Sequence, residues 1–134
     1  MSNEPFMEHP TGEYATAIDA MEEAISRLRA LPEWNEWITF CAQGEGSSPE
    51  NVHFAEVRLL SEILDPGVPL NVAQITAQAG VSRRTLTEAG STRYSIAGAT
   101  PREVAQILDA VFRYQLGIHP FPNENNDYPV GAEW

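Results

Sequence analysis

Few side chains in this sequence have a type and spacing that could support catalysis or metal binding. His53 and Glu56 lie three residues apart, which on a helix would place two ligands of one metal ion on the same face. A metal site needs at least three protein ligands, and no third one is indicated beside them. The lone Cys41 shares its expected face with Trp34 and Trp37, which favours a small core residue over a nucleophile. We therefore expect no metal, no cofactor and no enzymatic activity.

A second set of side chains could act through charge alone. Five glutamates cluster in the sequence around one loop and the starts of two expected helices: Glu33, Glu36, Glu45, Glu50 and Glu56. Carboxylates gathered on one surface accelerate association with a basic partner and select against acidic ones. We therefore expect an acidic face that binds a protein. The alternative is a solvated face that only keeps the protein in solution.

The distribution of charge agrees with a basic protein partner. The chain has 8 basic and 19 acidic residues, a formal net charge of -11, and every basic residue is an arginine. Residues 1–67 contain 13 acidic and 3 basic residues, whereas residues 68–134 contain 6 and 5. A protein this negative repels the phosphates of nucleic acids and anionic lipids at long range. The acidic half is therefore where we expect the partner to bind.

Length and hydropathy define the broad class of protein. With 134 residues, 43% of them hydrophobic, the chain is long enough to bury one core, and its single cysteine excludes an internal disulfide. No stretch approaches the roughly 18 apolar residues that span a bilayer, and residues 1–10 are acidic where a signal peptide would be basic. We expect one cytoplasmic helical domain over 1–134, with an irregular N-terminus over 1–12 and an extended C-terminal tail over 119–134.

The elements that would position these side chains are predicted to be helices. Apolar residues at steps of three and four predict an amphipathic helix over 14–31, which Pro32 ends. The same proline can begin a second helix over 33–43. A third helix, over 49–64, carries apolar residues on two stripes and is expected at the centre of the fold.

Two shorter helices are predicted after these. Asn71 is a good cap for a helix over 72–79, and Gly80 permits the left-handed turn that ends it. A further short helix is expected to open at Ser82 and to end near Gly90.

The last helix has the clearest boundaries. Thr100, Pro101 and Glu103 supply the cap, the first-turn proline and the acidic residue of a capping box, and Gly117 makes the stop. The alternation around Tyr94 allows one short strand element. The predicted fold is therefore mainly α, a compact bundle of about six helices with an irregular tail over 119–134.

Residues 54–86 contain the one motif that resembles a known family. A helix and a Pro/Gly break precede the run LNVAQITAQAGVSRRTL at 70–86. In local pattern this run resembles the helix-turn-helix of tetracycline-repressor-type bacterial regulators. The resemblance implies that four residues would point into the major groove of DNA: Ser82, Arg83, Arg84 and Thr85.

Two functions of different classes are therefore predicted. The first is a non-enzymatic, acidic protein-binding module, in particular a bacterial immunity or antitoxin-like protein that neutralises a basic toxin or effector by direct binding. The alternative is a DNA-binding transcriptional regulator that uses residues 71–89. The charge of the chain favours the first, because phosphate contacts supply most of the affinity of DNA-binding proteins.

Overall fold

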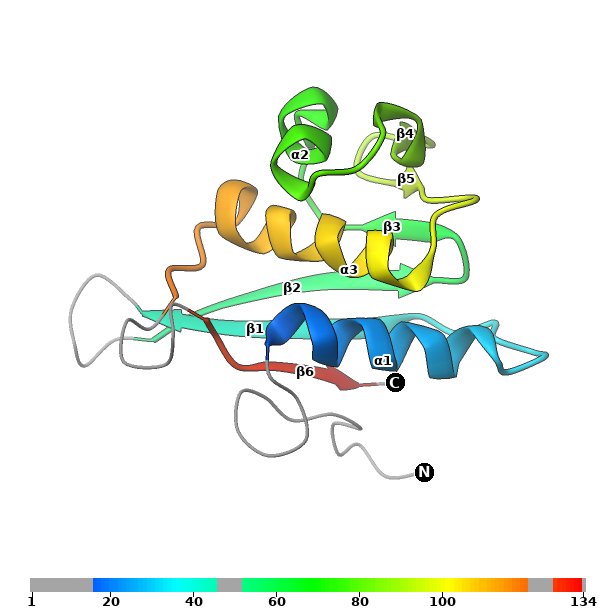
Figure 1. Ribbon diagram of the computed structural model, residues 1–134, viewed down its shortest axis with the longest axis horizontal. Helices are drawn as coiled ribbons and strands as arrows, with labels where there is room; N and C mark the ends of the chain where they lie inside the picture. The colour runs from blue at the N-terminus through cyan, green and yellow to red at the C-terminus, as the bar shows by residue number, and fades with distance from the viewer. Residues whose placement is uncertain (1–15, 46–51, 121–126, 134) are drawn as a thin grey trace.

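The chain forms an antiparallel β-sheet with helices across one of its faces, an α+β fold (Figure 1). The computed structural model describes residues 16–45, 52–120 and 127–133. Six strands pair in the order β4-β5-β3-β2-β1-β6, and each neighbouring pair is antiparallel. The prediction of a mainly α bundle of about six helices is therefore wrong.

Three helices and six strands follow one another along the described chain. The two longer helices, α1 and α3, pack side by side, and the shorter α2 packs against α3. The elements in chain order are α1 (Ala17–Arg29), β1 (Ile38–Glu45), β2 (Val52–Leu60), β3 (Ile63–Asp65), α2 (Val72–Ala79), the 3₁₀ turn η1 (Arg83–Thr85), β4 (Thr87–Glu88), β5 (Tyr94–Ser95), α3 (Pro101–Ala110), the π-helical turn η2 (Val111–Gln115) and β6 (Val130–Glu133).

The predicted first and last helices are confirmed as α1 and α3. The Thr16 hydroxyl accepts the Asp19 N–H at 3.1 Å and caps α1. At α3 the capping box is complete, since Thr100 accepts the Glu103 N–H at 3.1 Å and Glu103 accepts the Thr100 N–H at 2.9 Å. Each helix buries its apolar stripe against the sheet or the other helix.

The helices predicted over 33–43 and 49–64 are wrong. The described parts of these ranges form the connection before β1, most of β1, the strand β2, the turn after it and the start of β3. In β1, Ile38, Phe40 and Ala42 are buried, while the residues between them are only partly buried. This alternation has the period of a strand, and the face turned away from α1 and α3 is called the outer face below. A short apolar run fits the period of a helix as well as that of a strand. Here β1 pairs with β2 over the whole length of β1, and this pairing favours the strands.

The predictions for residues 72–95 and for the C-terminal tail are partly right. The short helix expected from Ser82 to near Gly90 is the three-residue turn η1 followed by β4, and the irregular tail contains strand β6. The predicted helix over 72–79 is confirmed as α2, with Gly80 at φ +72° as its left-handed stop. The strand predicted around Tyr94 is confirmed as β5.

A buried polar network fastens the chain before β6 to both long helices. The Asp127 carboxylate accepts the Ala17 N–H at 2.9 Å at the first turn of α1. The Tyr128 hydroxyl donates to Asp109 at 2.6 Å, and the same carboxylate forms an ion pair with Arg113 at 2.8 Å. Burial, followed by the charge of Asp109, raises the pKa of Tyr128 well above its ordinary value. The phenol therefore remains a hydrogen-bond donor at neutral pH.

Candidate functional site

The structure separates the five glutamates that were expected on one acidic face. Glu33 and Glu36 lie in the connection between α1 and β1, whereas Glu45 ends β1. A strand of eight residues spans about 23 Å at about 3.3 Å per residue, so Glu45 is far from the other two. Glu56 lies in β2 and contacts Cys41 on the outer face, and Glu50 lies outside the described residues. Among those of the five that can be placed in the described chain, Glu33 and Glu36 share one surface.

That surface is called the Trp34 end, and it comprises Leu31, Glu33, Trp34, Glu36 and Glu62. Leu31 is 53% exposed and lines a hollow together with the half-buried Trp34, so an apolar surface is open to solvent here. The Trp34 indole donates to the carbonyl of Glu36 at 2.9 Å, and this bond fixes the ring. Two adjacent hollows, of about 350 and about 320 Å³, meet here and share three apolar residues: Leu28, Leu31 and Trp34.

The Trp34 end is acidic because its carboxylates are not neutralised locally. Glu33, Glu36 and Glu62 are exposed, and none forms an ion pair with any residue that the structure describes. The one cation that lines the same hollows is Arg29, which donates to the carbonyl of Ala99. Three carboxylates thus face one guanidinium, and the surface carries a net negative charge.

Sequence reasoning missed Glu62, because it placed this residue inside a helix. In the structure Glu62 lies in the two-residue turn between β2 and β3, after Ser61 with φ +54°. The signal was present: two apolar pairs, 59–60 and 63–64, flank the polar residues at 61 and 62. Two polar residues between apolar pairs have the length of a tight hairpin turn, although Ser-Glu lacks the glycine that such turns favour.

A charged cluster on the outer face pairs one carboxylate with two guanidinium groups. Asp65 is only 6% exposed, and its carboxylate lies 2.9 Å from Arg58 Nη2 and 3.6 Å from Arg93 Nε. The two guanidinium groups lie 4.8 and 5.1 Å from the ring centroid of Trp37. Burial alone would raise the pKa of Asp65, but the Gly67 N–H and Arg58 outweigh it and hold this pKa below its ordinary value. We assign this cluster to stability.

Replacing Asp65 with Asn should destabilise the protein at neutral pH and much less in acid. We expect a loss of about 1–3 kcal/mol at pH 7, because the amide has no charge to pair with Arg58 and Arg93 and has one acceptor oxygen where the carboxylate has two. The folded-state pKa is depressed, so the stabilisation is complete above the unfolded value of about 3.9 and is lost as pH falls through the folded value. Urea unfolding of both proteins across this range checks it. A difference that stays constant down to the lowest pH would contradict it.

The other candidate chemical groups have structural partners. Cys41 lies on the outer face, not on the buried face expected, with its Sγ 3.6 Å from Glu56 Oε1. Burial, with the Glu56 charge, raises the pKa of Cys41 to about 11, so its thiol stays protonated. His53 Nε2 donates to the carbonyl of Leu116 at 2.8 Å. Within the described ranges, no group of three or more His, Cys, Asp or Glu side chains could hold a metal ion.

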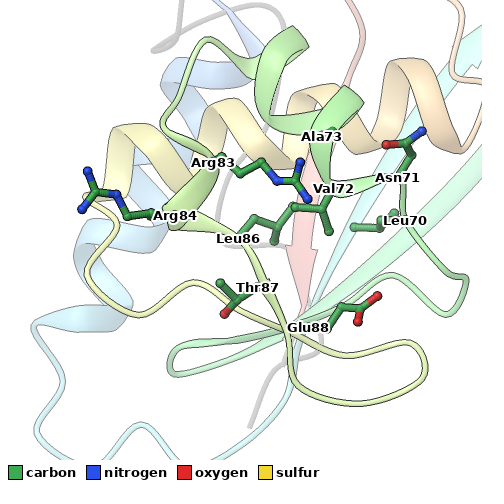
Figure 2. A pocket seen from close by; sticks show the side chains of 9 residues that line it. All are labelled: Leu70, Asn71, Val72, Ala73, Arg83, Arg84, Leu86, Thr87 and Glu88. Carbon is green, nitrogen blue, oxygen red and sulfur yellow. The ribbon is translucent and has the colours of Figure 1, made fainter.

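The four residues implied by the helix-turn-helix resemblance lie together around η1. The Ser82 hydroxyl accepts the Arg84 N–H at 3.3 Å, and the Thr85 hydroxyl donates to the Ser82 carbonyl at 2.6 Å. Arg83 and Arg84 are exposed, and no acceptor for either guanidinium lies in the part of the chain that the structure describes. Both arginines line a hollow of about 590 Å³ (Figure 2). The turn brings together two free cations without a recognition helix.

No protein-family model, curated protein or solved structure matches this chain. Among the described residues, no helix has both the length and the apolar character needed to cross a membrane. Two surfaces of the described chain combine charged groups that have no ion-pair partner with apolar side chains: the Trp34 end and the hollow at η1.

Proposed function

We propose that this protein is a non-enzymatic protein-binding module that binds a basic segment of a partner protein at the Trp34 end. The biological role that suits such a module is that of a bacterial immunity or antitoxin-like protein, which neutralises a toxin or effector by direct binding. One observation carries the proposal: exposed Leu31 and half-buried Trp34 lie among three carboxylates that have no ion-pair partner in the described chain.

The chemistry of this surface suits an arginine or lysine side chain of the partner. The methylene stem of such a side chain can lie on Leu31 and Trp34 while its charged head reaches the carboxylates. Apolar anchors surrounded by a polar rim are typical of the residues that dominate binding energy at protein interfaces. The net charge of -11 would add long-range attraction for the same partner.

Removing two charges from the Trp34 end should weaken capture of the partner more than removing two charges elsewhere. We expect the double variant with Glu33→Gln and Glu36→Gln to bind roughly tenfold more weakly than wild type at about 50 mM salt. Each of the two substitutions removes one electrostatic contact with the partner. The matched control carries Glu56→Gln and Glu133→Gln, two exposed acids in the sheet, and should bind nearly as wild type does.

The measurement is capture of basic proteins from a native extract by the immobilised full chain, at low and high salt. Release of the captured protein at high salt is expected for contacts between exposed charges. Equal losses in the test and control variants would show a general charge effect and contradict the proposed site. Capture of no basic protein would contradict the proposed function.

Binding of duplex DNA through Ser82, Arg83, Arg84 and Thr85 is the second candidate function. The observation that favours it is the pair of exposed arginines without an acceptor in the described chain. We rank it second because a recognition helix contacts bases along the major groove, whereas η1 has three residues. Retention of a duplex in a gel at about 50 mM salt, lost on changing either arginine, would favour this candidate.

A further inference from the structure

The hollow at η1 has an apolar floor and a polar rim. It measures about 590 Å³ and lies between the first turn of α2 and the edge strand β4. The side chains of Leu70, Val72 and Leu86 converge on its floor, as Figure 2 shows. This volume falls in the range of pockets that hold a small molecule or a few residues of a peptide.

Arg83 is the cation that faces this floor. Figure 2 shows its guanidinium beside the first turn of α2. Arg84 also lines the hollow, but its guanidinium lies farther from that turn, and Glu88 lies on the other side of the floor. The remaining arginines are already engaged by carboxylate or carbonyl acceptors: Arg27, Arg29, Arg58, Arg93, Arg102 and Arg113. An exposed guanidinium above an apolar floor suits an anion attached to an apolar group.

The edge strand at the same hollow can pair with an extended peptide. Among the strands of the described residues, β4 pairs only with β5, so none of these strands occupies its other edge. The Ala89 N–H donates to the Arg93 carbonyl at 2.9 Å, and because pairing in an antiparallel ladder alternates, the main-chain groups of Glu88 point away from β5. Free main-chain donors and acceptors at a sheet edge bind another extended strand.

We propose that this hollow binds the C-terminal residue of a partner polypeptide. The terminal carboxylate lies on Arg83, the last side chain is apolar and covers Leu70, Val72 and Leu86, and the peptide main chain pairs with the free edge of β4. The Glu88 carboxylate repels a second negative charge at the other side of the floor, which orients the peptide. This site shares no residue with the Trp34 end, so its test is independent of the function proposed for that surface.

The carboxylate requirement can be tested with three short probes. Acetylated tetrapeptides that end in Val, Leu or Phe are titrated, as free acids and as carboxamides, into the ¹⁵N-labelled full chain, up to about 5 mM, which detects an affinity as weak as about 1 mM. We expect at least one free acid to shift the amide signals of Val72, Ala73 and Glu88. Its carboxamide should bind about tenfold more weakly or worse, because a charge-assisted contact is lost. Equal binding of acid and carboxamide would overturn the proposal, as would shifts in none of these amides with any probe.

The neighbouring arginines provide a matched pair of variants. Arg83→Ala should weaken binding of the free acid about as much as amidation of the probe does, whereas Arg84→Ala removes the same charge one residue away and should leave binding within about twofold of wild type. Both side chains are exposed, so both variants are expected to fold, and unchanged signals from β1 and β2 confirm this. Equal losses in the two variants, together with retention of duplex DNA, would overturn the peptide proposal in favour of nucleic-acid binding.

Discussion

Replacing Tyr128 with Ala is expected to lower the free energy of unfolding by about 3–5 kcal/mol, the range for truncating a buried aromatic side chain. Tyr128 is fully buried and meets Phe112 edge to face, with ring centroids 6.1 Å apart and an interplanar angle of 67°. The guanidinium of Arg113 lies 5.1 Å from the same ring. Alanine would leave a cavity between these groups and would remove the hydroxyl that donates to Asp109.

The variant Tyr128→Phe separates packing from hydrogen bonding at this position. It keeps the ring and loses only the donor to Asp109, so we expect a smaller loss of about 1.5–3 kcal/mol, the range for a hydrogen bond to a charged group. Urea unfolding followed by circular dichroism measures both variants at pH 7. If Phe were as destabilising as Ala, the ring packing would contribute little and the cavity argument would be wrong.

The second large effect is expected for Gly44→Ala in β1. A Cβ built at Gly44 would lie 2.8 Å from the carbonyl oxygen of His119 and 2.9 Å from Cγ2 of Ile118. The first contact is with main chain, which cannot rotate away as a flexible side chain can, so the segment around His119 must shift. Overpacking of this kind costs about 1–3 kcal/mol.

Gly90→Ala provides the control for Gly44→Ala. The nearest atom to a Cβ at Gly90 is Cβ of Arg93 at 3.5 Å, an ordinary van der Waals distance, and we expect a change within about 0.5 kcal/mol. Thermal unfolding of both variants compares them directly. A midpoint for Gly44→Ala as high as that of Gly90→Ala would show that the chain at 118–119 adjusts at no cost.

The parts of the fold that could be predicted from the sequence are those that local interactions determine. α1 and α3 have both a helical apolar period and a cap within three residues of the first turn, so nearby residues suffice to define them. Trp34, Trp37, Ile38 and Cys41 fit a helical period, yet the two tryptophans lie in the connection before β1. Ile38 and Cys41 lie in β1, where pairing with β2 makes the chain a strand. That pairing depends on residues far along the chain, which periodicity does not register.

The candidate sites were predictable to a similar extent. The positions of Glu33 and Glu36 in the sequence were enough to group them. Glu62 could be added only with the knowledge that the β2–β3 hairpin places it at the same surface. The cap at Ser82 and the left-handed Gly80 are both confirmed, since each is local. The helix expected after Ser82 does not extend, because Thr87 and Glu88 pair with β5 instead.

The bond between Asp127 and Ala17 has a consequence for how the chain folds. It joins positions 110 residues apart, and β6 pairs with β1 across a comparable separation. Closing a loop of this length costs chain entropy before any contact compensates for it, whereas the β1–β2 hairpin closes a short one. We therefore expect the hairpin to assemble early and β6 to dock late, so that the start of α1 acquires its carboxylate partner only in the final step of folding.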